Sequence, residues 1–307
     1  MNYFILLIGF FLLIKGADWF VSGASDLAKL LRVPSVIIGL TIVAMGTSAP
    51  ELSVSITGSL GGQSGISVGN VIGSNLFNLL CVGGLSAMIR PMTVNHELLK
   101  RDIPISLAAA VLFFITAING YLARWEGALF LALFALFLAL MLRDALRFRS
   151  TAKEDSSDVK LGKSLVFIVL GLLGVILGGN LVVDSATKIA LNFGLSDSLV
   201  GLTVVALGTS LPELVTSLVA AKKGENDIAM GNIIGSNIFN IGLVLGTTTV
   251  IHPMNVARFV TVDDLYLCGV TLLLLFFVLR DKKLSRGQGT VLFLLYFPYL
   301  VYIFLRG

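Results

Sequence analysis

Long apolar runs separated by short polar stretches recur along the whole chain. A helix needs about 20 predominantly apolar residues to cross the hydrocarbon core of a bilayer. The pattern therefore predicts an all-α integral membrane protein with about ten transmembrane helices. The expected spans lie near residues 2–23, 35–58, 66–89, 102–118, 125–146, 163–187, 198–221, 227–250, 262–280 and 287–305.

One polar segment, Phe148 to Lys163, stands out because it combines charges of both signs with Ser and Thr. It is too short to hold a domain, so we expect a loop between two halves of five spans each. The predicted division is an N-terminal half at 1–147, a linker at 148–162 and a C-terminal half at 163–307.

A stretch of the first half recurs in the second. Residues 39–78 read GLTIVAMGTSAPELSVSITGSLGGQSGISVGNVIGSNLFN, and residues 201–240 read GLTVVALGTSLPELVTSLVAAKKGENDIAMGNIIGSNIFN. The copies align without a gap at an offset of 162 residues, and 22 of the 40 positions are identical. Because each half has an odd number of spans, the second copy enters the membrane from the opposite side. Inverted repeats of this kind are typical of secondary transporters.

Composition and charge agree with this architecture. The chain is 56% hydrophobic and 13% charged, which no ordinary soluble domain of 307 residues matches. Its net charge of +4 is scattered over short loops, without the basic stripe of a nucleic-acid surface. Seventeen Lys and Arg fall on the side of the central linker, against four on the other side. The positive-inside rule then predicts a multi-pass protein of the plasma or inner membrane, with a cytoplasmic linker and both termini outside.

Each copy begins with a motif that predicts a break in its helix. In the first copy, Gly46 to Glu51 read GTSAPE, and Pro50 lacks an N–H and clashes with the carbonyl of Gly46. A span with this sequence should kink or unwind near Thr47, and the freed carbonyls need a partner such as a cation. Thr47 and Glu51 are four residues apart, so both can face the same way. The second copy repeats the motif as GTSLPE, with Thr209, Ser210 and Glu213.

The second element of each copy adds neutral oxygen donors. Ser74 and Asn78 are four residues apart in GNVIGSNLFN, as are Ser236 and Asn240 in GNIIGSNIFN. With the two glutamates they form an all-oxygen set without His or Cys, which suits a hard cation such as Ca²⁺ rather than zinc or copper. Monovalent ions or protons are alternative occupants, and hydrogen bonds within the helices are the structural alternative for each hydroxyl. Charge at membrane depth is costly, so Glu51 and Glu213 indicate a functional site.

Residues outside the repeats have plainer expectations. The acids near predicted span ends, among them Asp102 and Asp144, should be solvated or snorkel to the interface. Cys81 and Cys268 lie far apart in apolar runs and should be small buried hydrophobes.

The paired motifs resemble the two alpha repeats of the cation/calcium antiporter superfamily, and the match is closest to prokaryotic sodium/calcium exchangers and their bacterial relatives. The resemblance covers the whole chain. It implies a central calcium site of Glu51 and Glu213, with Thr47 and Thr209 acting through backbone carbonyls. It implies two flanking sodium sites, one of Ser48, Ser74, Glu51 and the Ala44 carbonyl, the other of Ser210, Ser236, Glu213 and the Ala206 carbonyl. Asn78 and Asn240 would complete the centre.

The resemblance also implies a mechanism. Sodium and calcium would occupy the same cage in turn, and the first and sixth spans would slide against the core to expose it to either side. We therefore expect a sodium/calcium antiporter that needs no cofactor, and that has the lipid bilayer and small cations as its partners. A proton/calcium exchanger of the same fold, an exchanger of another divalent cation, and a passive cation channel remain alternatives. An intramembrane enzyme is disfavoured, since the chain has no HExxH pair.

Overall fold

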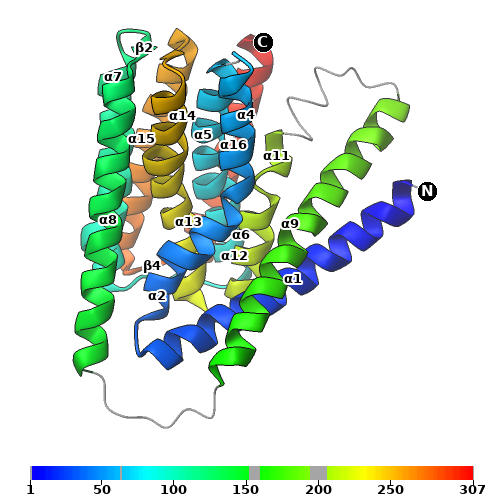
Figure 1. Cartoon of the computed structure of the whole chain (residues 1–307), viewed down its shortest axis with the longest axis vertical. Helices are drawn as coiled ribbons and strands as arrows, with labels where there is room; N and C mark the ends of the chain where they lie inside the picture. Colours follow the sequence, from blue (N-terminus) through cyan, green and yellow to red (C-terminus); the bar gives the residue numbers. More distant parts are fainter. Residues whose placement is uncertain (1, 63, 152–159, 194–205, 307) are drawn as a thin grey trace.

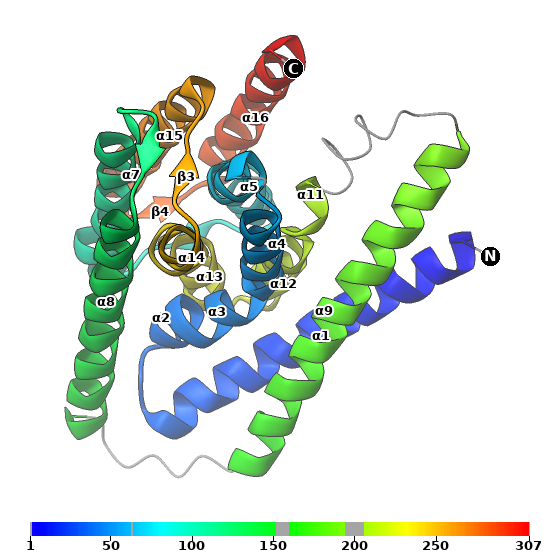
Figure 2. The same cartoon turned by 45° about the horizontal axis from the view of Figure 1, so that its top comes forward.

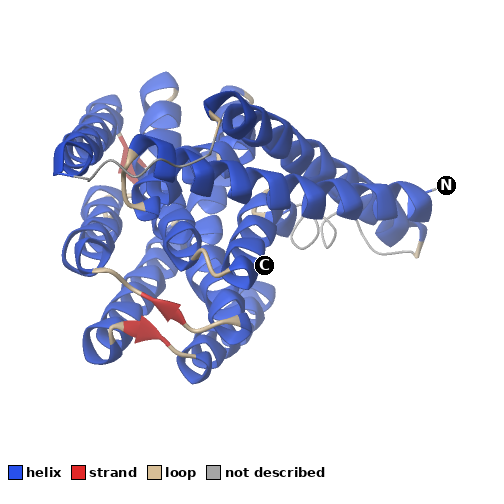
Figure 3. Ribbon diagram, turned by 90° about the horizontal axis from the view of Figure 1, so that it is seen from below, coloured by secondary structure: helices blue, strands red, loops and turns tan. Residues whose placement is uncertain are grey.

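The computed structural model describes residues 2–62, 64–151, 160–193 and 206–306. Helices make up nearly all of the described chain, and the strands in it are two short pairs (Figure 3). This arrangement confirms the predicted all-α membrane fold, which follows from the length of the apolar runs.

The first half contains helices, π-helical segments (η) and two short strands. In chain order these are α1 (Asn2–Leu31), α2 (Ser35–Ile38), η1 (Gly39–Val43), α3 (Ala44–Thr47), α4 (Ala49–Leu60), α5 (Ser64–Phe77), η2 (Asn78–Gly83), α6 (Gly84–Ile89), β1 (Met92–Thr93), η3 (Leu98–Asp102), α7 (Ile103–Ala117), β2 (Tyr121–Leu122) and α8 (Arg124–Thr151).

The described part of the second half follows the same order. It consists of α9 (Leu161–Asn192), α11 (Ala206–Gly208), α12 (Leu211–Lys223), α13 (Asn226–Phe239), η5 (Asn240–Leu245), α14 (Gly246–Ile251), β3 (Met254–Asn255), α15 (Arg258–Asp281), β4 (Lys283–Leu284) and α16 (Arg286–Arg306). Most of the expected linker, 152–159, and the start of the second repeat, 201–205, lie outside the described residues.

Seven helical stretches of the described chain are long and apolar enough to cross a membrane, and a bent pair, 35–47 with 49–60, gives an eighth. Of the ten expected spans, the one at 102–118 corresponds to α7, which has 15 residues and is too short to count by itself. The expected span at 198–221 begins outside the described residues. The count of ten therefore stays a prediction.

The strand pairs show how the halves are related. Strand β1 pairs antiparallel with β4, and β2 pairs antiparallel with β3. Adding the offset of 162 to Met92 of β1 gives Met254 of β3, and adding it to Tyr121 of β2 gives Lys283 of β4. Each pair therefore joins the two halves, and exchanging the halves converts one pair into the other. Figure 1 shows β2 and β4 toward opposite ends of the molecule, as inverted repeats require.

The first helices of the two halves, α1 and α9, lie side by side at one edge of the molecule (Figures 1 and 2). They run antiparallel, since Gly9 approaches Gly178 while Gly23 approaches Ser164. A methyl group on Gly16 would lie 2.6 Å from the backbone nitrogen of Val175, so the backbones meet directly. Small residues are what permits such close approach in membrane helices.

The helices that carry the repeat motifs pack against one another in the main body of the protein. Helix α13 packs on α2, η1 and α3, and a methyl group on Gly231 would lie 2.8 Å from the carbonyl oxygen of Val36. Gly231 and Gly235, four residues apart on α13, therefore permit close helix packing. Cys81 and Cys268 are free and buried, which confirms that expectation.

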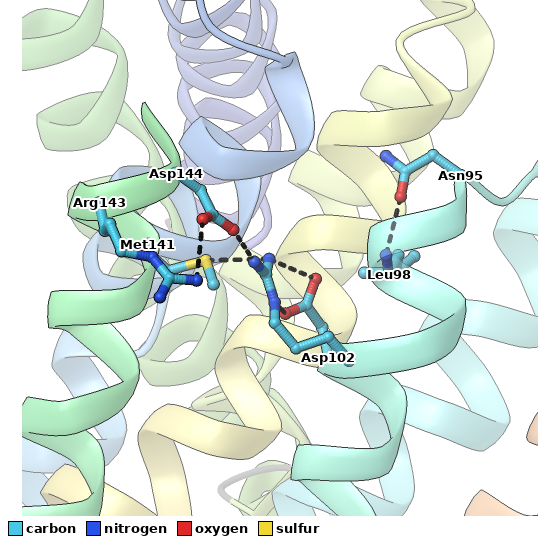
Figure 4. Close-up of polar contacts among 7 residues, drawn as sticks. Asn95, Leu98, Asp102, Met141, Arg143 and Asp144 are labelled. Atoms are coloured by element: carbon cyan, nitrogen blue, oxygen red, sulfur yellow. Dashed lines mark hydrogen bonds and ion pairs between the residues drawn. The ribbon is translucent and has the colours of Figure 1, made fainter. Parts of the chain in front are cut away.

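One expectation about acidic residues was wrong. Asp102 is fully buried rather than solvated, and the Arg101 guanidinium binds it, with Nε 2.6 Å from Oδ1. Arg101 also contacts Asp144 of α8, so Arg101, Asp102 and Asp144 together join η3 to α8 (Figure 4). The guanidinium offsets part of the cost of desolvating the Asp102 carboxylate.

Candidate functional site

The two predicted helix breaks bring the repeat glutamates into the protein interior. Helix α3 ends at Thr47, Ser48 leaves the helical conformation, and α4 starts at Ala49 with a bend of 45°. In the second repeat Ser210 has nearly the same backbone angles before α12 starts at Leu211. Prolines at the start of α4 and α12 explain both breaks, since proline fits the first turn of a helix but not its interior.

Glu51 and Glu213 lie in the first turns of α4 and α12, and both are fully buried. One oxygen of each carboxylate accepts a hydroxyl hydrogen bond. The Oε2 atoms of both are buried and have no hydrogen-bond partner. No Lys or Arg of the described chain forms an ion pair with either glutamate. The carboxylates of Glu51 and Glu213, when both are ionised, can therefore balance the two positive charges of a divalent cation.

The hydroxyls reach the glutamates across the repeats. Ser48 of the first repeat donates to Oε1 of Glu213 at 2.8 Å, and Ser210 of the second donates to Oε1 of Glu51 at 3.0 Å. Ser74 lies 3.5 Å from the same Glu51 oxygen and 3.0 Å from the Ser210 hydroxyl. The sodium sites implied by the resemblance combined Ser48 with Glu51 and Ser210 with Glu213. In the structure each serine instead donates its hydrogen bond to the glutamate of the other repeat. Sequence spacing could not reveal this arrangement, because the contacts join residues about 160 positions apart.

Asn78 and Asn240 occupy equivalent places, each as the first residue of a π-helical segment. The Asn78 amide nitrogen donates to Oδ1 of Asn237 at 3.2 Å, and that of Asn240 donates to Oδ1 of Asn75 at 3.0 Å. Their own Oδ1 atoms are buried without a partner. Short π-helical segments are frequent at functional sites. Both amides therefore have an acceptor oxygen available for a ligand.

The remaining predicted site residues are placed as follows. Thr47 and Ser236 are fully buried, Thr209 is half-buried, and the Ser236 hydroxyl has no partner. The Ala44 carbonyl accepts the Ser48 N–H at 3.0 Å. Ala206 is the first residue of α11. The structure thus brings carboxylates, hydroxyls and amides of both repeats together, whereas the implied carbonyl ligands remain predictions.

Four asparagines of the site were missed from the sequence. Asn75 and Asn237 bond reciprocally, each amide nitrogen donating to the backbone carbonyl of the other at 3.3 and 3.2 Å. Asn70 and Asn232 donate to the backbone carbonyls of Glu51 and Glu213 at 3.3 and 3.4 Å. All four are identical between the copies at the offset of 162. Identity of these amides between the two copies, inside predicted membrane spans, was the signal that could have found them.

A helical membrane protein of two inverted halves, with two buried carboxylates and unpartnered amide oxygens between them, is a secondary transporter of cations. The family model described as sodium/calcium exchanger protein matches residues 1–143 and 163–305, so the chain belongs to this family. Its activity is antiport of calcium and another cation across a membrane, and it is a transporter rather than an enzyme.

Relatives and solved structures agree over nearly the whole chain. The sodium/calcium exchanger MaX1 of Methanosarcina acetivorans is 35% identical, covering 99% of both chains. The inner membrane protein YrbG of Escherichia coli is 39% identical, covering 94% of this chain and 92% of its own. The structure of the sodium-calcium exchanger NCX_Mj soaked with 2.5 mM Na⁺ and 1 mM Sr²⁺ matches with a TM-score of 0.89 at 36% identity. It covers 98% of this chain and 97% of its own.

Proposed function

We propose that the protein exchanges sodium for calcium by alternating access and uses the sodium gradient to expel calcium. The observation that carries this proposal is the pair of buried glutamates whose Oε2 atoms lack partners beside unpartnered amide oxygens. Two carboxylates balance one divalent ion, and neutral oxygens complete the coordination that Ca²⁺ prefers. The names of MaX1 and NCX_Mj support sodium as the counter-ion.

The proposed calcium site consists of Glu51 and Glu213 with the backbone carbonyls of Thr47 and Thr209, and Asn78 and Asn240 complete the centre. For the sodium sites we adopt the contacts across the repeats. One site then comprises Glu51, Ser74, Ser210 and the Ala206 carbonyl, and the other comprises Glu213, Ser48, Ser236 and the Ala44 carbonyl. Both sodium sites share a glutamate with the calcium site, so sodium and calcium exclude each other, which is the requirement for exchange.

Access would alternate through movement of α1 and α9 against the rest of the protein. These helices contact each other along their length through glycines, and they lie at one edge of the molecule (Figure 2). A backbone-to-backbone contact lets the pair move as one body. If more sodium charge than calcium charge crosses, each extra charge contributes ~2.3 kcal/mol per 100 mV.

The proposed location is the plasma or inner membrane, with the linker at 148–162 in the cytoplasm and both termini outside. The bias of Lys and Arg supports this orientation, and YrbG is named as an inner membrane protein. The halves at 1–147 and 163–307 would then be the two inverted repeats.

The test is calcium-45 uptake into proteoliposomes loaded with sodium and diluted into sodium-free buffer. Wild type should take up calcium only when sodium is inside. Glu51→Gln and Glu213→Gln should each abolish uptake, because each removes half of the negative charge that holds the ion. The matched control, Asp281→Asn, removes an exposed carboxylate and should transport like the wild type.

Other outcomes identify the alternatives. Uptake driven by a pH gradient without sodium would replace sodium by protons as the counter-ion. Calcium flux without any counter-ion would indicate a passive channel. Absence of sodium-dependent uptake by folded wild type would reject the proposed ion pair.

A further inference from the structure

The hydroxyl of Thr47 has three hydrogen-bond acceptors within 3.4 Å but only one proton to donate. Its Oγ1 lies 3.1 Å from the Val43 carbonyl, 3.4 Å from the Ala44 carbonyl and 3.0 Å from Oδ1 of Asn232. The first two belong to its own helix, and Asn232 belongs to the opposite repeat. Thr47 and Asn232 are fully buried. The protein groups therefore compete for this proton among themselves.

The orientation of the Asn232 amide follows from its other contacts. Its Nδ2 lies 3.4 Å from the backbone carbonyl of Glu213 and 2.9 Å from the hydroxyl of Ser217. A carbonyl can only accept, so the amide nitrogen must face Glu213. The amide oxygen then faces Thr47 and accepts its proton. Asn232 thus links the backbone of one ion-binding glutamate to the helix break of the other repeat.

The same link recurs at the repeat-related positions. Asn70 donates to the Glu51 carbonyl at 3.3 Å and to the Ser55 hydroxyl at 3.0 Å, and its Oδ1 lies 3.4 Å from the Thr209 hydroxyl. The contact between a motif threonine and an asparagine of the other repeat therefore occurs twice, once in each direction between the repeats. Neither Asn70 nor Asn232 was part of the ion site proposed above.

We propose that Asn232 is a positioning residue that sets how readily the Ala44 carbonyl binds sodium. When Asn232 accepts the Thr47 proton, the carbonyls of Val43 and Ala44 are relieved of that donor, and Ala44 keeps a lone pair for an ion. Without Asn232 the Thr47 hydroxyl turns back to its own helix and competes with sodium for that oxygen. Asn70 acts likewise on Thr209. The inference rests on the proposed function, because it uses the Ala44 carbonyl as a sodium ligand.

The experiment is a double-mutant cycle of Asn232→Leu and Thr47→Val, read as the sodium and calcium concentrations that give half-maximal exchange. Asn232→Leu should raise the half-maximal sodium concentration about fivefold, the factor that corresponds to one neutral hydrogen bond. The half-maximal calcium concentration should change less than about twofold. Adding Thr47→Val removes the competing hydroxyl and should bring the sodium value back toward that of Thr47→Val alone.

Ser217→Ala is the matched control. It removes another partner of Asn232 but leaves the contact with Thr47, so sodium dependence should stay at the wild-type value. Thermal unfolding without added ions is measured for every variant. If Asn232→Leu does not fold, Asn70→Leu with Thr209→Val poses the same question in the other repeat.

Two results would overturn the inference: equal shifts for sodium and calcium, or additive effects of Asn232→Leu and Thr47→Val. Failure of the proposed function has a separate signature, since wild type would then show no sodium-dependent calcium flux. In that case, stabilisation of the purified variants against heat by sodium and by calcium still decides the role of Asn232.

Discussion

The Asp102 carboxylate illustrates how a single residue near a span end departs from expectation. Acids at helix ends usually reach water, but η3 turns this one inward, where Arg101 binds it. Its repeat counterpart, Asp264, is also fully buried, and neither of its carboxylate oxygens has a hydrogen-bond partner. Both halves thus have a buried aspartate at this position, but within the described chain only Asp102 has a cationic partner. The second half has Asp263 at the position that corresponds to Arg101.

The structure predicts what removal of that cation does. Arg101→Met leaves a buried carboxylate without compensation, so the free energy of unfolding should fall by about 3–5 kcal/mol. Replacing both partners, as Arg101→Met with Asp102→Leu, should cost less. Thermal or denaturant unfolding in detergent measures both. Arg143→Met serves as a control, because the Arg143 side chain is largely exposed and Asp144 keeps its contact with Arg101, so we expect a loss of less than about 1 kcal/mol.

A result in which the double variant is as unstable as Arg101→Met would contradict the buried-pair explanation. The cost would then come from lost packing of the Arg101 side chain rather than from the unpaired carboxylate.

At the scale of elements, the contact between α1 and α9 depends on residues without side chains. A methyl group on Gly171 would lie 2.4 Å from the backbone nitrogen of Phe20, a distance that no real contact tolerates. Seven-residue spacing of Gly9, Gly16 and Gly23 keeps small residues on one face of α1. The two helices therefore fit each other only at this short separation.

Gly171→Ala should force α1 and α9 apart and slow exchange at least about tenfold, because the helix pair could no longer move as one body. Calcium-45 uptake at saturating ion concentrations measures the effect. The control is Gly269→Ala in α15, where an added methyl group meets no described atom within 4 Å and alanine favours the helix. Wild-type exchange by Gly171→Ala would argue against joint movement of α1 and α9.

At the scale of the whole molecule, two short strand pairs and a set of asparagine contacts tie the inverted halves together. The candidate ligands of the two halves contact each other, since Ser48 donates to Glu213 and Ser210 donates to Glu51. The proposed site therefore lies where the halves meet, as in transporters with inverted repeats.

The orientation in the membrane can be tested because both native cysteines are buried. A single exposed cysteine placed at Lys222 should react with an impermeant thiol reagent only from the cytoplasmic side. One placed at Arg258 should react only from outside. Both positions are exposed in the structure. Labelling of intact cells and of inside-out vesicles gives the answer, and the opposite pattern would invert the proposed topology without affecting the fold.

The sequence by itself determined the helical membrane fold, the inverted repeats and the breaks in the two motif helices, which the structure places at Ser48 and Ser210. These features follow from properties of the chain itself: the length of the apolar runs, the repeated stretch of 40 residues and the geometry of proline. The sequence also predicts Glu51 and Glu213 as site residues, since a carboxylate inside an apolar run is costly. The structure buries both side chains, and their role in ion binding stays a prediction.

Only the tertiary structure decided which side chains form hydrogen bonds across the repeats. These bonds run from Ser48 to Glu213, from Ser210 to Glu51 and from Thr47 to Asn232. Hydrogen bonds depend on distances of about 3 Å between atoms far apart in the chain, and spacing along one helix carries no such information. The burial of Asp102 with Arg101 had the same origin, because the packing of η3 against its neighbours, rather than the position of Asp102 in the sequence, set its solvent exposure.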